Sequence, residues 1–164
     1  KIARIRERWP EVAITTDVIV GFPGETDAMF EQGYQFMKEI AFSEMHVFPY
    51  SKRTGTPAAR MEDQIDDEVK NERVHRLIDL SEEMQLNYAK RFVGRELEII
   101  PEREAKGEGT QGLLTGHTDN YLHISVPGDA SLIGRMVKVR VTEAGVNECK
   151  GVQAADPVSR AASF

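Results

Sequence analysis

Two glycines around a Phe-Pro pair are the first residues whose types and spacing point to chemistry, in the stretch IVGFPGET at positions 19–26. An apolar run ends at Gly21, so the turn follows a predicted strand, where α/β folds place their ligand crevices. Glycines let a ligand approach the backbone closely, and Pro23 stiffens the turn. The stretch has neither the Gly-Lys-Ser/Thr ending of a P-loop nor the spaced glycines of a dinucleotide fingerprint, which argues against a phosphate cradle. The alternative is a tight turn into a helix that Thr26 caps.

A second candidate is the stretch FPYSKRTGTPA at positions 48–58, which begins at the same end of the next predicted strand. Tyr50, Lys52 and Arg53 suit an anionic or aromatic ligand, although such residues on a loop are more often simply solvated. Loops at the carboxyl ends of adjacent parallel strands lie side by side, so the two stretches together favour one shared site.

The β-rich half of the chain offers candidates for contacts with RNA. Tyr121 and His123 share one predicted strand face and suit base stacking, whereas Lys138 and Arg140 suit phosphate contacts. The alternative is an ordinary solvated strand face.

The remaining chemically distinctive residues are interpreted as structural. His46 falls within a predicted strand and His75 within a predicted helix, and neither lies near the Cys, His or Asp neighbours of a metal site in the sequence. Cys149 is the single cysteine, which excludes an internal disulfide and any metal site built from several cysteines of this chain. It is expected to be a free thiol.

The composition narrows the class of protein. The 164 residues are 40% hydrophobic with a net charge of −6, which is ordinary for a soluble globular protein and unfavourable for a non-specific nucleic-acid binder. Any RNA contact must therefore be local. No apolar stretch reaches the roughly 20 residues of a membrane span, and no secretory signal is visible. These features predict a cytoplasmic protein that does not engage membranes.

Apolar periodicity predicts an α/β segment that positions the two candidate loops. Residues 2–9 have helical spacing, and residues 11–21 form a β-branched run typical of a strand buried on both faces. A helix over 27–40 and a second strand over 43–50 follow. Strand, helix and strand in this order predict a βαβ unit with two parallel strands.

A long loop and a helix over residues 66–92 come next, and after Gly94 the apolar period changes to two. Strands are predicted over 95–100, 120–126 and 134–141, with Leu122, Ile124 and Val126 on one face and Tyr121, His123 and Ser125 on the other. Short strands separated by glycines are typical of a small β-barrel.

Several motifs together resemble one known family, the radical S-adenosylmethionine methylthiotransferases, in the branch that modifies threonylcarbamoyladenosine in tRNA. The similarity runs from about residue 10 to residue 155 and covers the C-terminal part of that family. The motifs that carry it are TDVIVGFPGET, HVFPYSKRTGTPAARM, VKNERVHRL, GHTDNYLHISV and GRMVKVRV.

This resemblance implies an α/β plus β fold: the last strands and helices of a radical-SAM partial (βα)6 barrel, followed by a small β-barrel called TRAM. Residues 1–92 would be the barrel part with its connecting helix, residues 93–155 the RNA-binding TRAM barrel, and residues 156–164 a disordered tail. The chain begins within an element, so we expect it to be a piece of a longer protein whose cluster-bearing strands lie upstream of Lys1.

Members of the family carry two 4Fe–4S clusters, and a Cys-x3-Cys-x2-Cys motif holds the one that cleaves S-adenosylmethionine. The resulting radical takes a hydrogen from the adenine ring before methylthio insertion. This chain lacks both cysteine sets. The resemblance therefore implies that the segment alone binds no cofactor, contains no catalytic or metal-binding residue and is at most a tRNA-binding piece of the enzyme.

The resemblance also assigns site residues, with no specific role for Glu25. Those that would line the S-adenosylmethionine site of the whole enzyme are Ile19, Gly21, Phe22, Pro23, Gly24, Phe48, Pro49, Tyr50 and Arg53. Those that would contact tRNA are Tyr121, His123, Lys138 and Arg140.

Two strands cannot close a barrel, so we expect exposed strand edges and apolar surface that a second copy or a rearrangement covers. Two alternative functions stay open. The chain is an RNA-binding TRAM module without catalysis, or it belongs to a branch that modifies other tRNA adenosines or a ribosomal protein.

Overall fold

The computed structural model describes residues 1–106 and 109–154. The chain forms two compact units, Lys1–Gln85 and the part from Leu86 onward. The domain boundary predicted between residues 92 and 93 stays a prediction, and the predicted disordered tail lies outside the described residues. No helix in the described ranges is both long and apolar enough to cross a membrane.

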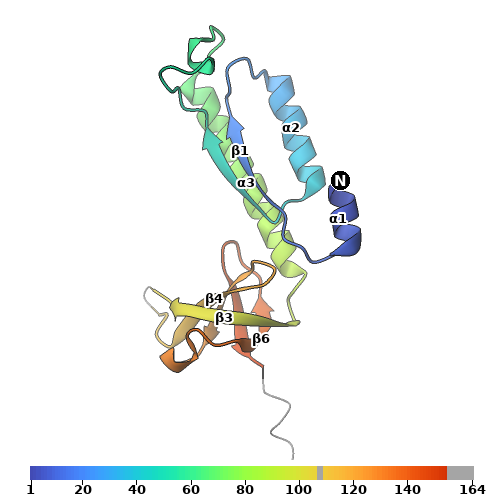
Figure 1. The fold of residues 1–164 in the computed structure, drawn as a ribbon, viewed down its shortest axis with the longest axis vertical. Coiled ribbons are helices and arrows are strands. Elements are labelled where there is room, and N and C mark those ends of the chain that lie inside the picture. The colour runs from blue at the N-terminus through green and yellow to red at the C-terminus, as the bar shows by residue number, and fades with distance from the viewer. Residues whose placement is uncertain (107–108, 155–164) are drawn as a thin grey trace, which may run out of the picture. The chain divides into compact units, whose positions relative to one another are not determined.

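The first unit contains the predicted βαβ arrangement (Figure 1). Its elements are α1 (Ile2–Arg8), β1 (Thr15–Val20), α2 (Asp27–Ile40), β2 (Glu44–Pro49), the short 3-10 helix η1 (Ala58–Arg60) and α3 (Asp67–Lys90), which continues into the second unit. Strands β1 and β2 pair in parallel, from Thr15 opposite Glu44 to Val20 opposite Pro49. The prediction of two parallel strands joined by a helix is confirmed.

Helix α2 begins as the sequence predicts, directly after the glycine turn. The Thr26 hydroxyl accepts a hydrogen bond from the Met29 N–H at 3.2 Å, and Asp27 occupies the first turn, where the helix dipole favours a negative charge. Ala41 ends the helix in the left-handed conformation. The predicted cap at Thr26 is confirmed, so the position of the turn relative to α2 is set locally.

The core of the first unit lies on one side of the two-stranded sheet. Both long helices contribute to it, and its buried members are Val20, Phe30, Met37, Phe42, Met45, Leu77, Leu80 and Met84. Within it the Ser81 hydroxyl accepts a hydrogen bond from the Met45 N–H, which anchors α3 to β2.

The opposite side of the sheet is open. The prediction that β1 is buried on both faces is wrong, because its residues alternate between exposed and partly buried as far as Val20. Ile19 is 59% exposed, and its partner Phe48 on β2 is 51% exposed. The physical reason is that the helices supply core residues on one side only, and no described segment of this unit forms a third strand.

The second unit is a closed five-stranded barrel, which confirms the predicted small β-barrel. Neighbouring strands follow the order β3-β4-β5-β7-β6, and only β5 and β7 pair in parallel. Its strands are β3 (Glu96–Glu104), β4 (Leu113–Thr118), β5 (His123–Pro127), β6 (Val137–Glu143) and β7 (Cys149–Gln153), with the 3-10 helix η2 (Ala130–Leu132) before β6. Strands β4 and β7 were not predicted individually.

The barrel core follows the predicted alternation with one exception. Leu122, Ile124 and Val126 are buried as predicted, but Ser125, predicted on the polar face, is also buried. Its hydroxyl donates to the Cys149 carbonyl on β7 at 3.3 Å, so the neighbouring strand satisfies a polar side chain that water would otherwise solvate.

Cys149 itself is buried in the barrel core. Burial is the main cause that raises the pKa of its thiol, so the group stays protonated at neutral pH. It behaves as a small apolar core residue.

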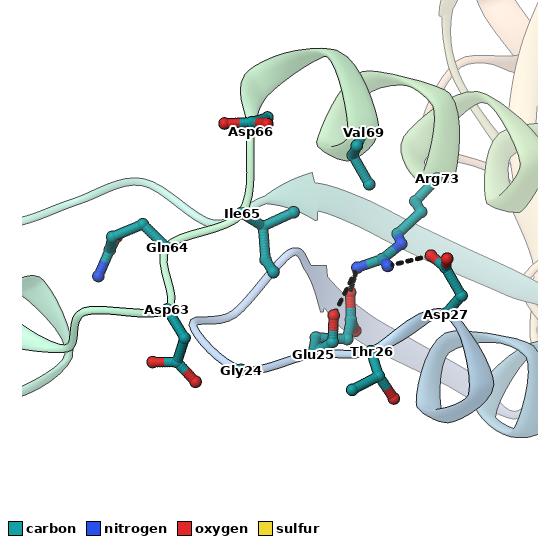
Figure 2. A pocket seen from close by; sticks show the side chains of 10 residues that line it. All are labelled: Gly24, Glu25, Thr26, Asp27, Asp63, Gln64, Ile65, Asp66, Val69 and Arg73. Atoms are coloured by element: carbon teal, nitrogen blue, oxygen red, sulfur yellow. Dashed lines mark hydrogen bonds and ion pairs between the residues drawn. The ribbon is translucent and has the colours of Figure 1, made fainter.

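A buried cation joins α3 to the glycine turn. Arg73 on α3 is 5% exposed, and its guanidinium bonds the Glu25 carboxylate at 2.6 Å, the Glu25 carbonyl at 3.1 Å and Asp27 at 2.7 Å (Figure 2). The Glu25 side chain is itself only 20% exposed. Because both members of the Arg73–Glu25 pair are largely shielded from water, loss of either one leaves an uncompensated charge.

We predict that Arg73→Met destabilises the first unit by about 2 kcal/mol, because methionine keeps the packing but leaves the Glu25 carboxylate without its cation. The described α-helices end at Lys90. Urea unfolding followed by helical circular dichroism therefore reports mainly on this unit.

Arg76→Met is the matched control. Arg76 lies on the same helix and pairs with Glu31 at 2.7 Å, but both side chains are more than 40% exposed. Surface pairs of this kind contribute less than about 1 kcal/mol. Equal effects of the two substitutions would contradict the special role of Arg73.

Candidate functional site

The glycine turn owes both of its glycines to backbone conformation and close packing. Gly21 and Gly24 have φ angles of +72° and +86°, in the left-handed region that glycine adopts at little cost. A Cβ at Gly21 would overlap the side chain of Lys70, and one at Gly24 would lie 2.5 Å from the Asp63 carboxylate. The space beside each glycine is thus filled by the chain's own residues.

Hydrogen bonds within the chain use the amide groups of the turn. Glu25 accepts from the Gly21 N–H at 2.7 Å, and its own N–H donates to the Phe22 carbonyl at 2.9 Å. The Gly24 N–H donates to the Asp63 carbonyl at 2.9 Å. These three amides have no capacity left for a phosphate, which agrees with the sequence argument against a phosphate cradle.

Glu25 and Arg73 are therefore the residues that hold the turn in place. The sequence alone indicates no role for Glu25 and does not distinguish Arg73 from the other arginines. The two residues are 48 positions apart, and no local pattern links them.

Aromatic and apolar side chains gather on the open side of β1 and β2. Ile19 and Phe48 are register partners, and the rings of Phe22 and Tyr50 meet edge to face with centroids 5.3 Å apart. The structure thus brings four of the predicted cofactor residues together as two neighbouring pairs. The Tyr50 hydroxyl is buried and has no hydrogen-bond partner among the described residues.

The other predicted cofactor residues lie around these pairs. Pro23 is buried in the turn, and Pro49 ends β2 opposite Val20. Arg53 is exposed on the following loop, where its carbonyl accepts hydrogen bonds from Thr56. None of the described contacts joins the Arg53 side chain to the turn.

The turn and its surroundings fit some cofactor groups and not others. Exposed rings beside a buried hydroxyl that no described residue satisfies suit a flat group with polar edges, such as an adenosyl group. An iron–sulfur cluster does not fit, because it requires several thiolates and the chain has one buried cysteine. Across the described ranges, no three His, Cys, Asp or Glu side chains are arranged to hold a metal ion.

A cleft of about 520 Å³ also borders the turn, but it differs from the predicted site (Figure 2). The two share only Gly24. The cleft runs between the turn and the start of α3, and carboxylates dominate its lining: Glu25, Asp27, Asp63 and Asp66. Arg73 already neutralises two of them.

On the barrel, three rings form a cluster on the outer surface of β4, β5 and the turn between them. The His117 ring lies 5.4 Å from that of Tyr121 and 4.8 Å from that of His123, centroid to centroid. We call His117, Tyr121 and His123 the ring cluster. It contains both predicted stacking residues and adds His117, which the sequence analysis did not select.

The pairing of β4 with β5 explains this addition, because His117 is the register partner of His123. A hairpin folded within the stretch GHTDNYLH at positions 116–123 would place both histidines on one face. That signal was present in the sequence, but it required knowing that residues 113–118 form a strand.

Each histidine of the ring cluster is held by an acceptor at Nδ1. His117 Nδ1 lies 2.9 Å from the Glu102 carboxylate. His123 Nδ1 lies 3.3 Å from the Asn147 carbonyl and 3.6 Å from the Glu148 carboxylate. The hydrogen bond with His117 is the main cause that lowers the pKa of Glu102, which is therefore ionised at neutral pH.

The two predicted phosphate-binding residues lie on a different strand. Lys138 and Arg140 project from β6, opposite Glu98 and Glu96 of β3. Arg140 forms an ion pair with Glu96 at 2.6 Å. Strand β3 separates β6 from β4, so the structure does not join these cations to the ring cluster.

Comparisons with known proteins agree with this architecture. The family model of the TRAM domain matches residues 90–150, which include most of the barrel. The threonylcarbamoyladenosine tRNA methylthiotransferase MtaB of Bacillus subtilis is 52% identical over 145 residues, which are 88% of this chain and 32% of the relative.

Two further relatives are named tRNA-2-methylthio-N(6)-dimethylallyladenosine synthases. The protein of Acetivibrio thermocellus is 41% identical over 85% of this chain and 29% of its own length. The protein of Bacillus mycoides is 39% identical over 96% of this chain and 30% of its own length. The chain thus spans about a third of the length of these curated relatives. Residues 90–150 thus match a TRAM domain, and most of the chain is homologous to the C-terminal region of tRNA methylthiotransferases.

Proposed function

We propose that this chain is the C-terminal portion of an enzyme that methylthiolates C2 of the adenine in N6-threonylcarbamoyladenosine of tRNA by radical-SAM chemistry. The observation that carries the substrate assignment is the 52% identity to the threonylcarbamoyladenosine enzyme, against 41% and 39% to the two dimethylallyladenosine synthases. As a tRNA-modifying protein it would work in the cytoplasm.

In this proposal β1 and β2 are the last two strands of a radical-SAM partial barrel, and α3 leads to the TRAM barrel. The parallel pairing, the α2 crossover and the open apolar face all support it. The preceding strands of the whole enzyme would cover the open face. In the isolated chain a second copy would cover it.

The open face would then hold S-adenosylmethionine, which supplies the methyl group and the radical chemistry when bound in the whole enzyme. Ile19, Phe22 and Phe48 would pack on the adenosyl group, and the Tyr50 hydroxyl would gain a hydrogen-bond partner that no described residue supplies. The turn would form a rigid wall that excludes water. The cluster cysteines would come from outside this segment, since its single cysteine, Cys149, is buried in the barrel core.

The barrel would bind tRNA through Tyr121, His123, Lys138 and Arg140. A second candidate function is an RNA-binding module without catalysis, which the TRAM match alone would satisfy. The absence of cluster cysteines from the sequence favours that alternative for the isolated segment.

A chimeric enzyme tests the catalytic proposal. We expect that the Bacillus subtilis relative, with its corresponding C-terminal region replaced by this chain, restores the 2-methylthio modification of threonylcarbamoyladenosine in cells that lack their own enzyme. Mass spectrometry of tRNA nucleosides measures the product. A chimera that is stably produced but yields no product, or that modifies only dimethylallyladenosine, would overturn the assignment.

Within this chimera, Phe48→Ala should reduce the product about 5- to 30-fold, because the adenosyl group loses a stacking surface worth roughly 1–2 kcal/mol. Phe36→Ala is the matched control. Phe36 lies on α2 and is 56% exposed, close to the 51% of Phe48, but it lies outside the proposed site. Equal losses from the two substitutions would count against the site.

Salt dependence tests the RNA contacts of the chain itself. Lys138→Ala combined with Arg140→Ala should weaken binding of a tRNA transcript and flatten the slope of log K against log salt by roughly two units, one for each lost phosphate contact. The control is Arg4→Ala combined with Lys38→Ala, which removes the same charge from two exposed positions of the first unit. An unchanged slope in the barrel variant would remove both residues from the RNA interface.

A further inference from the structure

Tyr121 lies in a turn whose backbone conformation is unfavourable for a bulky residue. Its φ angle is +68°, in the left-handed region that a bulky side chain rarely adopts. The turn is nevertheless closed, because the Tyr121 N–H donates to the Thr118 carbonyl at 3.1 Å and the Leu122 N–H donates to the Thr118 hydroxyl at 2.9 Å. The ring gains little burial in return, since Tyr121 is 66% exposed and its described ring contact is with His117. Residues held in such conformations cluster at binding and active sites.

Contacts at Nδ1 fix the orientation of the two histidine rings beside Tyr121. A carboxylate only accepts hydrogen bonds, so Nδ1 of His117 carries the proton toward Glu102. Nδ1 of His123 likewise faces two acceptors, the Asn147 carbonyl and the Glu148 carboxylate. With the Nδ1 edge of each ring turned toward these acceptors, each ring is held at one edge and its Nε2 atom points away from them.

The charge around the ring cluster selects against phosphates. Glu102 and Glu148 place two carboxylates next to the rings, and a phosphate group would be repelled there. The cations predicted to contact phosphates lie two strands away on β6, and Arg140 is already paired with Glu96. The cluster therefore suits an uncharged, flat ligand.

Apolar surface extends from the rings across β3. Ile100 is the register partner of His117 and is 47% exposed. A flat group that stacks on His117 and Tyr121 would thus find an apolar neighbour on one side and hydrogen-bonding imidazole nitrogens on the other.

We propose that the ring cluster binds one unpaired nucleobase of an RNA loop by stacking, and that this contact does not depend on phosphate neutralisation by Lys138 and Arg140. The inference rests on the proposed function, RNA binding by the barrel, and adds His117 as a binding residue and an unstacked base as the ligand. A base in a duplex is excluded, because its faces are covered by neighbouring bases and its phosphates approach the two carboxylates.

The test uses the whole chain and a short single-stranded RNA with a central 2-aminopurine, whose fluorescence falls when the base stacks on a ring. The same RNA in a duplex is the comparison. We expect the single strand to bind with quenched fluorescence and the duplex to bind at least tenfold more weakly. Tyr121→Gly and His117→Ala should each weaken single-strand binding about tenfold and abolish the quenching.

Tyr121→Gly separates binding from folding. Glycine adopts the left-handed conformation at little cost, so this variant should be at least as stable as the original chain in urea. Tyr121→Asn provides a second variant, because asparagine also tolerates this conformation. Loss of binding in a fully folded variant then reports on the ring itself.

The doubly substituted Lys138→Ala and Arg140→Ala variant separates base stacking at the ring cluster from the phosphate contacts of the barrel. It should retain the quenched fluorescence of the bound probe while its salt dependence falls. If the probe binds but ring substitutions change neither affinity nor quenching, the stacking site is wrong and RNA binding by the barrel stands. If neither the probe nor a tRNA transcript binds at low salt, the proposed RNA-binding function of the barrel fails as well.

Discussion

The first unit depends on the buried ion pair between Arg73 and Glu25. The Glu25 carboxylate accepts the Gly21 N–H on one side of the turn and meets the guanidinium of α3 on the other. Because Arg73 also bonds the Glu25 carbonyl and Asp27, one cation fixes the exit of β1, the turn and the start of α2. The Gly21 amide is thereby used by Glu25, and the Gly24 and Glu25 amides bond the carbonyls of Asp63 and Phe22. What the turn presents outward is therefore a stiff apolar surface and not an anion-binding loop.

The second unit is constrained in a different way. Closure of the five strands into a barrel gives each strand a hydrogen-bonded neighbour on both sides. No edge of the described barrel sheet is therefore left to pair with another chain. The outer face is then free to carry side chains that contribute nothing to the core. The ring cluster uses this freedom, and the left-handed Tyr121 displays its ring at a cost in backbone energy.

Much of the fold was predictable because the signals that define it are local. A β-branched run before glycine, a threonine cap and an alternating apolar pattern each involve residues within a few positions of one another. The parallel pair, the start of α2 and the barrel were therefore predicted correctly. The burial of β1 was not, because an apolar strand looks the same whether or not a second layer covers it. Ser125 was misplaced for the related reason that its partner, the Cys149 carbonyl, belongs to another strand.

By itself, the sequence determined the order of the elements, the caps and the motifs that relate this chain to tRNA methylthiotransferases. Only the tertiary structure decided which side chains meet. Arg73 reaches Glu25 across 48 positions, and Glu102 reaches His117 across 15. Propensity, periodicity and capping act between neighbours along the chain, whereas ion pairs and ring contacts depend on how distant strands and helices close on one another. That closure separated the cations of β6 from the rings of β4 and β5, although the sequence had placed all of them in one candidate group.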